Sequence, residues 1–104
     1  MTAAYRLTPQ AREGFLRIVR YVEERFGLEV ADRIVTDLEN AFELLAANPH
    51  VGHHREDLTR DVRVLFWSVG PTLIAYRLGR QSVEVLFIER GEIDWERLLT
   101  DRLE

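Results

Sequence analysis

Residues 8–49 of the chain read TPQAREGFLRIVRYVEERFGLEVADRIVTDLENAFELLAANP. Apolar residues recur in this stretch at spacings of three and four, first from Ala11 to Phe26 and again from Ala31 to Leu45. Such spacing places them on one face of a helix, with the charged residues mostly on the other. Because only a few residues around Gly27 separate the two runs, the stretch predicts two antiparallel helices with a very short connection.

The ends of both helices are marked by residues with specific backbone properties. Thr8 can cap the first helix, and Pro9 suits its first position, where a backbone amide has no partner. We expect Gly27 to close this helix in a left-handed conformation, which glycine adopts at little cost. Asn48–Pro49 ends the second helix, because a residue that precedes proline is disfavoured in helical geometry.

Three β-strands are predicted after the hairpin, at residues 62–69, 72–78 and 83–89, with short turns between them that indicate an antiparallel meander. Residues 5–7 form a short extended segment, and residues 94–99 have the periodicity of a short C-terminal helix. The predicted fold class is α+β, with the N-terminal helical hairpin packed on a mostly antiparallel sheet of three to four strands. We expect the hairpin to cover one face of the sheet and the other face to be partly open to a partner.

The composition suits a single domain over residues 1–104, with 46% hydrophobic and 31% charged residues. No apolar run approaches the roughly 20 residues that span a membrane, and the N-terminus lacks the apolar core of a secretory signal. Cysteine is absent, which excludes disulfides and thiolate chemistry. We therefore expect the protein in the cytoplasm. Its net charge of −4 argues against an extended phosphate-binding surface but is compatible with a local basic patch.

No constellation of residues points to catalysis, since the chain has no glycine-rich phosphate loop and no nucleophile elbow. All 14 basic residues are arginine, so no lysine can form a Schiff base. His50, His53 and His54 share a loop without a carboxylate or cysteine framework, which favours incidental histidines over a metal site. We therefore expect no cofactor, no metal and no catalytic residue.

The region from Arg55 to Arg80 is locally basic, with five arginines against three acids. Beside an exposed Trp67 or Tyr76, such a patch would suit nucleic acid or an acidic protein. Ordinary surface arginines and core aromatic residues would give the same composition, so the residues alone leave both interpretations open.

An ordered set of short motifs runs through nearly the whole chain. Its parts are YRLTPQA at 5–11, Gly27, AFELLAANP at 41–49 with Gly52, REDL at 55–58, YR at 76–77, VEVL at 83–86, and Gly91 ahead of DWERLL at 94–99. In this order they resemble the ParE toxins of bacterial type II toxin–antitoxin modules, within the wider ParE/RelE group. The resemblance implies the same hairpin-on-sheet fold and a cognate antitoxin whose disordered segment folds on binding.

ParE-type toxins act on DNA gyrase, whereas their RelE relatives cut messenger RNA on the ribosome with basic residues and a late tyrosine or histidine. This chain has no lysine, no tyrosine after Tyr76 and no histidine after His54, which favours a gyrase inhibitor over an enzyme. The family's His–Gly pair after the last strand is Arg90–Gly91 here, and Glu92–Ile93 follow where basic residues are usual.

The resemblance thus implies a toxin that inhibits DNA gyrase, forms a hetero-oligomer with a co-encoded antitoxin, and meets DNA only through that antitoxin. The alternatives are a RelE-like ribosome-dependent endoribonuclease and a detoxified relative that still binds its antitoxin. The residues expected to contact the target are Arg77, Arg80, Arg90 and Trp95. Those expected to contact the antitoxin are Ile34, Leu38, Phe42, Leu65 and Trp67, with Trp67 as an aromatic anchor.

Overall fold

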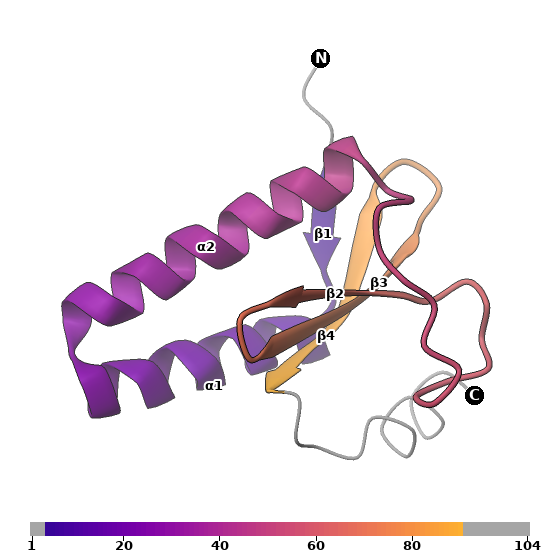
Figure 1. Ribbon diagram of the computed structural model, residues 1–104. Coiled ribbons are helices and arrows are strands. Elements are labelled where there is room, and N and C mark those ends of the chain that lie inside the picture. Colours follow the sequence, from indigo (N-terminus) through magenta and orange to yellow (C-terminus); the bar gives the residue numbers. More distant parts are fainter. Residues whose placement is uncertain (1–3, 91–104) are drawn as a thin grey trace.

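The computed structural model of the protein describes residues 4–90, which form two helices and a four-stranded sheet (Figure 1). The elements in chain order are β1 (Tyr5–Leu7), α1 (Pro9–Phe26), α2 (Leu28–Ala47), β2 (Leu65–Val69), β3 (Thr72–Leu78) and β4 (Val83–Arg90). The predicted α+β class is therefore confirmed. The helix expected at residues 94–99 lies outside the described residues. Neither helix within residues 4–90 is long and apolar enough to cross a membrane.

The helical hairpin begins and turns as its sequence predicts. The Thr8 hydroxyl accepts a hydrogen bond from the Ala11 amide at 3.1 Å, and Pro9 is the first helical residue. Gly27 has a φ of +92°, which confirms the expected positive φ, but its ψ of 173° is extended rather than left-handed helical. This conformation favours glycine and leads directly into α2 at Leu28.

The sheet has the strand order β1-β4-β3-β2. Strands β2, β3 and β4 form the predicted antiparallel meander, and β1 adds to it in parallel, with Tyr5 opposite Val83. Gly70–Pro71 connects β2 to β3, with a φ of +57° at Gly70. A positive φ at the first of two turn residues only is the mark of a type II′ hairpin turn.

The strand predicted to start at residue 62 begins instead at Leu65. The Asp61 carboxylate accepts a hydrogen bond from the Arg63 amide at 2.9 Å, and the Asp61 carbonyl accepts one from the Val64 amide at 3.1 Å. These local bonds form a turn over the first residues of the predicted strand. Aspartate favours this alternative to a strand ladder through its short polar side chain.

Both faces of the sheet carry buried apolar residues. The face under the hairpin holds the larger cluster, in which Phe42 and Leu38 of α2 pack with Tyr76, Ile74 and other strand residues. The opposite face holds a second cluster, with Leu58 packed against it: Val64, Phe66, Leu73, Ala75, Leu86 and Phe87. The expectation that this second face is partly open is therefore wrong for these six residues, which are at most 7% exposed.

Helix α1 lies directly against β4 through Gly14. A Cβ atom built at Gly14 would lie only 2.1 Å from the backbone oxygen of Ile88. The obstacle is backbone, so it cannot move aside as a flexible side chain would. Glycine is required here because the helix approaches the strand more closely than any side chain permits.

Tyr76 fastens the loop after α2 to β3. Its hydroxyl accepts a hydrogen bond from the Gly52 amide at 2.9 Å and donates one to the Pro49 carbonyl at 2.8 Å. The residue is fully buried, and this burial raises the pKa of the hydroxyl above its usual value of 10.0. A Cβ at Gly52 would lie 2.5 Å from the same hydroxyl, so the loop residue and the tyrosine fit each other closely.

Replacing Gly14 with alanine tests the contact between α1 and β4. Helix propensity alone would make Gly14→Ala about 1 kcal/mol more stable, because alanine is the better helix former. The steric conflict with Ile88 should reverse that sign and lower the unfolding free energy by about 2 kcal/mol or more. Urea denaturation measures the difference, with Glu13→Ala as an exposed control on the same helix. A stabilised Gly14→Ala protein would contradict the packing.

Replacing Tyr76 with phenylalanine removes both loop hydrogen bonds and leaves the Gly52 amide without its partner. The unfolding free energy at neutral pH should fall by about 1–3 kcal/mol. Because the folded pKa is raised, the wild type should also lose stability as the pH rises above 10.0, where the unfolded tyrosine ionises first.

The Tyr76→Phe variant should lack the Tyr76 share of this alkaline loss, because phenylalanine has no hydroxyl to ionise. The remaining loss should include a share from Tyr5, whose pKa is also raised by burial. Denaturation curves at neutral and alkaline pH measure both effects, with Tyr21→Phe as the exposed control. Equal stability of wild type and Tyr76→Phe at neutral pH would show that the loop is held by other contacts.

Candidate functional site

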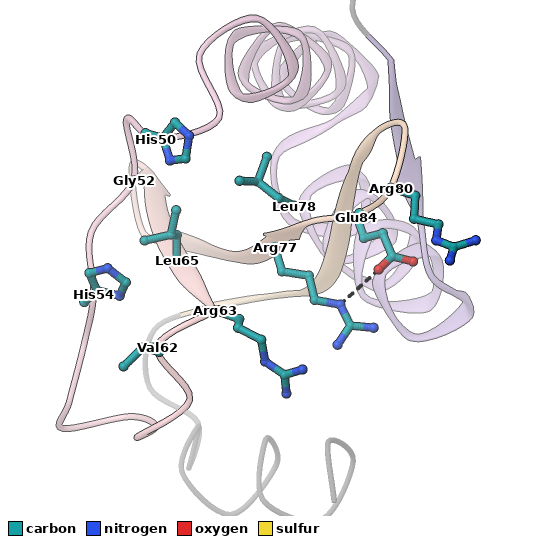
Figure 2. A pocket seen from close by; sticks show the side chains of 11 residues that line it. His50, Gly52, His54, Val62, Arg63, Leu65, Arg77, Leu78, Arg80 and Glu84 are labelled. Atoms are coloured by element: carbon teal, nitrogen blue, oxygen red, sulfur yellow. Dashed lines mark hydrogen bonds and ion pairs between the residues drawn. The ribbon is translucent and has the colours of Figure 1, made fainter.

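A pocket of about 790 Å³ opens at the end of the sheet, where the loop after α2 faces the β3–β4 turn (Figure 2). The loop contributes His50, Gly52, His54, Val62 and Arg63, and the strands and turn contribute Leu65, Arg77, Leu78, Gly79, Arg80 and Glu84. The hydroxyl of Tyr76 holds the loop side of this pocket in place through Gly52. The loop backbone that lines the pocket is therefore held in place by a hydrogen bond to the sheet.

The charge of the pocket is positive, since its lining holds three arginines and one carboxylate. That carboxylate, Glu84, accepts a hydrogen bond from Arg77 Nε at 2.9 Å and also pairs with Arg6 on the adjacent strand. These two arginines lower the pKa of the Glu84 carboxyl, and the hydrogen bond from Arg77 has the larger effect. Glu84 is thus a fixed anion that orients Arg77 (Figure 2).

The arginines retain donors that could bind an anion. Arg77 donates only its Nε to Glu84, so its two terminal amino groups make no hydrogen bond with residues 4–90, although the Asp61 carboxylate also interacts electrostatically with the guanidinium. Arg63 is held by Asp61 through two hydrogen bonds of 3.0 and 2.9 Å, which also lower the pKa of the Asp61 carboxyl. In Figure 2, Arg63 and Arg77 lie on one side of Glu84, whereas Arg80 lies on the other side.

The walls of the pocket are aliphatic. Val62 and Leu78 are 77% and 49% exposed, and the side chain of Leu65 lies between the loop and the sheet. The lining has no phenylalanine, tyrosine or tryptophan, and its only aromatic rings are the imidazoles of His50 and His54. The pocket therefore offers guanidinium groups and aliphatic surface, without the large aromatic side chains that usually form platforms for nucleic acid bases.

The three histidines of the loop lie in two different environments. His50 and His54 line the pocket, but the ring of His53 stacks on Trp67 with 6.2 Å between centroids and 13° between planes. The backbone of His53 also pairs with Phe66 at the outer edge of β2. Within residues 4–90, no group of three or more histidine, aspartate or glutamate side chains is placed to hold a metal ion.

The residues expected to contact the target lie at two separate places. Arg77 and Arg80 belong to the pocket, whereas Arg90 lies at the far end of β4, opposite Thr72. Arg90 lies six residue steps along β4 from Glu84, which corresponds to roughly 20 Å. There the Arg90 guanidinium lies 5.2 Å from the ring centroid of Tyr21, which Arg25 also contacts at 5.3 Å. Trp95 lies outside the described residues.

The residues expected to contact the antitoxin lie between the hairpin and the sheet. Leu38 and Phe42 are each 1% exposed and Leu65 is 8% exposed, because the apolar stripe of α2 faces the strands. A folded partner cannot reach the first two side chains. Ile34 and Trp67 are only partly buried at the margin of the same cluster, and a partner can reach them.

Sequence reasoning missed some residues of both places. Arg63 and Glu84 lie in the pocket, and the local excess of arginine between residues 55 and 80 was a signal for the first. Glu84 gave no signal, because only the pairing of three strands brings it between Arg6 and Arg77. Tyr21 likewise meets Arg90 only through the packing of α1 on β4.

Comparison with solved structures agrees with the fold. A chain from the chromosomal ParDE toxin–antitoxin system of P. aeruginosa superposes with a TM-score of 0.72 at 19% identity, over 88% of this chain and 98% of that one. At this identity the likeness shows the shared fold alone.

Comparison with known sequences goes further. Toxin ParE1 of Mycobacterium tuberculosis is 27% identical over 100 residues, which cover 95% of this chain and 100% of the relative. Toxin ParE1 of Caulobacter vibrioides is 30% identical over 86 residues, which cover 76% of this chain and 90% of the relative. The family model of the ParE toxin of type II toxin–antitoxin systems, parDE, matches residues 5–95. The chain therefore belongs to the ParE toxin family of type II toxin–antitoxin systems.

Proposed function

We propose that this protein inhibits DNA gyrase as a toxin and is neutralised by a cognate antitoxin in a cytoplasmic hetero-oligomer. The observation that carries the proposal is the family match, which extends over residues 5–95 and so includes the hairpin, the sheet and the start of the tail. DNA is reached only through gyrase or the antitoxin, because a chain with a net charge of −4 lacks an extended phosphate-binding surface.

The state of Tyr76 supports an inhibitor rather than a nuclease. A general acid or base must reach the proton that it transfers. Tyr76 is fully buried, and its hydroxyl already donates to Pro49 and accepts from Gly52. Burial also raises the pKa of this hydroxyl above 10.0, which makes it harder to ionise than an exposed tyrosine. The last tyrosine of the chain therefore serves the fold.

The proposed antitoxin surface follows the margin between the hairpin and the sheet. Ile34 and Trp67 would contact the antitoxin directly. The Trp67 ring is already fixed in orientation because it stacks on the ring of His53. The shape of that margin would be fixed by three buried side chains that lie beneath it, those of Leu38, Phe42 and Leu65. Rigid aromatic side chains at such positions are frequent anchors of protein interfaces.

A RelE-like ribonuclease is the second candidate, and one observation favours it. His50 and His54 lie in a pocket with three arginines, which is a combination that acid–base cleavage of a phosphodiester can use. The toxicity of the His54→Ala variant distinguishes the two candidate functions. A gyrase inhibitor should keep its full toxicity in this variant, whereas a nuclease dependent on His54 should lose most of it.

A reaction with purified gyrase tests the proposal. Full-length protein free of antitoxin is added to gyrase, ATP and relaxed plasmid, and the DNA is resolved after detergent and protease treatment. Linear plasmid should accumulate and supercoiling should fall, because a trapped gyrase holds cleaved DNA. Adding the antitoxin first should prevent both changes. Normal supercoiling in the presence of a large excess of folded protein would reject gyrase as the target.

The Arg90→Ala variant tests the place proposed for gyrase contact. Losing one charge-assisted contact should raise the concentration for half-maximal inhibition about tenfold. The melting temperature should fall by no more than a few degrees, because exposed cation–π contacts such as Arg90 on Tyr21 are worth only about 0.5–1 kcal/mol. Arg25→Ala is the matched control, since Arg25 contacts the same ring. Equal loss of inhibition in both variants would indicate that the Tyr21 ring, rather than Arg90, matters.

A further inference from the structure

We infer that the pocket at the end of the sheet binds an acidic, aliphatic peptide segment of a protein partner, with a carboxylate on Arg77 and Arg63. The juxtaposition that carries the inference is that of Arg77, held at one edge by Glu84, with the exposed aliphatic side chains of Val62 and Leu78. The inference goes beyond the proposed function, because it stands whether or not gyrase is the target.

The geometry of Arg77 suits a carboxylate. Glu84 accepts a hydrogen bond from the Nε of Arg77, and both terminal amino groups, with four N–H donors, make no hydrogen bond with residues 4–90. Two of these donors can bind the oxygens of one carboxylate in parallel. Because Glu84 fixes the guanidinium beforehand, less side-chain entropy is lost on binding. Glu84 is thus a positioning residue for Arg77.

The charge distribution favours a peptide over a nucleic acid. The pocket has three arginines against one carboxylate, yet the chain as a whole carries a net charge of −4. A long polyanion would meet repulsion outside the pocket, whereas a segment with one or two acidic side chains would not. Arg63 is already held by Asp61, so the pocket attracts an anion locally without forming a continuous basic track.

The aliphatic side chains of the pocket also favour a peptide over a nucleic acid. Val62, at 77% exposure, and Leu78, at 49%, lie on opposite sides of the opening, one from the loop and one from β3 (Figure 2). Exposed aliphatic side chains beside a charged group fit the alternating acidic and aliphatic residues of an extended peptide. Single-stranded nucleic acid usually binds through large aromatic platforms, and the lining offers only the small imidazole rings of His50 and His54.

A binding titration tests this inference with the full-length protein. The probe is a fluorescein-labelled peptide of alternating glutamate and leucine, and binding is followed by fluorescence anisotropy. The peptide should bind, a glutamine–leucine peptide of equal length should bind about tenfold more weakly, and added salt should weaken only the acidic peptide. A single-stranded RNA that carries the same number of negative charges should bind more weakly than the acidic peptide.

Three variants make the titration specific to the pocket. Arg77→Gln should weaken the acidic peptide about tenfold, whereas Arg17→Gln should not, although Arg17 also pairs with a glutamate of β4, Glu89, at 2.8 Å. Val62→Glu places a carboxylate at the rim of the pocket on a side chain too exposed to affect folding, and it should weaken the same probe.

Preferential binding of the RNA would overturn the inference in favour of a nucleic acid site. Equal binding to wild type, Arg77→Gln and Val62→Glu would overturn it in favour of another surface. Neither result would bear on gyrase inhibition, which is measured with plasmid DNA.

Discussion

The contact between Gly14 and the backbone of Ile88 is the constraint on which the arrangement of this molecule depends. It allows α1 to lie directly on β4, and the two elements then run along each other. Arg17, one turn further along α1, pairs with Glu89, and Tyr21, a second turn further, lies under the guanidinium of Arg90. Residues 14, 17 and 21 share one helix face, so a single close approach determines the contacts that follow it.

Strand β4 connects the two places where function is proposed. It pairs with β1 and β3, and it carries Glu84 at one end and Arg90 at the other. Glu84 gathers Arg6 and Arg77 at the pocket, whereas Arg90 rests on α1 and leads into the tail. The two ends are far enough apart that separate partners, or separate parts of one partner, can bind to them. Variants at one end should therefore leave the other end intact.

The sequence predicted most of the fold because local signals and core patterning agreed there. Thr8, Pro9 and Gly27 each have the structural role that their backbone chemistry indicated, and the meander follows its turns. The start of β2 was predicted three residues early, because the hydrogen bonds that Asp61 makes are a local alternative that β-propensity does not register. The parallel pairing of Tyr5 with Val83 depends on contact between distant residues, which periodicity cannot supply.

The candidate site was less predictable than the fold. The arginine-rich region indicated a basic patch at residues 55–80, but only the length of β4 shows that Arg90 lies at the opposite end of the sheet from Arg77. Three of the predicted antitoxin residues, Ile34, Leu38 and Phe42, lie on the apolar stripe of α2, and the same apolar character buries Leu38 and Phe42. An apolar stripe is typical of both a core and an interface. Only the packed structure shows that Ile34 and Trp67 lie at the margin of the core cluster.

We propose that the protein acts by binding gyrase and not by turnover. The most direct measurement is a titration of supercoiling activity at a fixed gyrase concentration well above the dissociation constant. Inhibition by binding predicts that activity falls linearly and reaches its minimum near one toxin per binding site, with no further change over time. Full inhibition by a small fraction of an equivalent, increasing with incubation, would contradict the claim and indicate a catalyst.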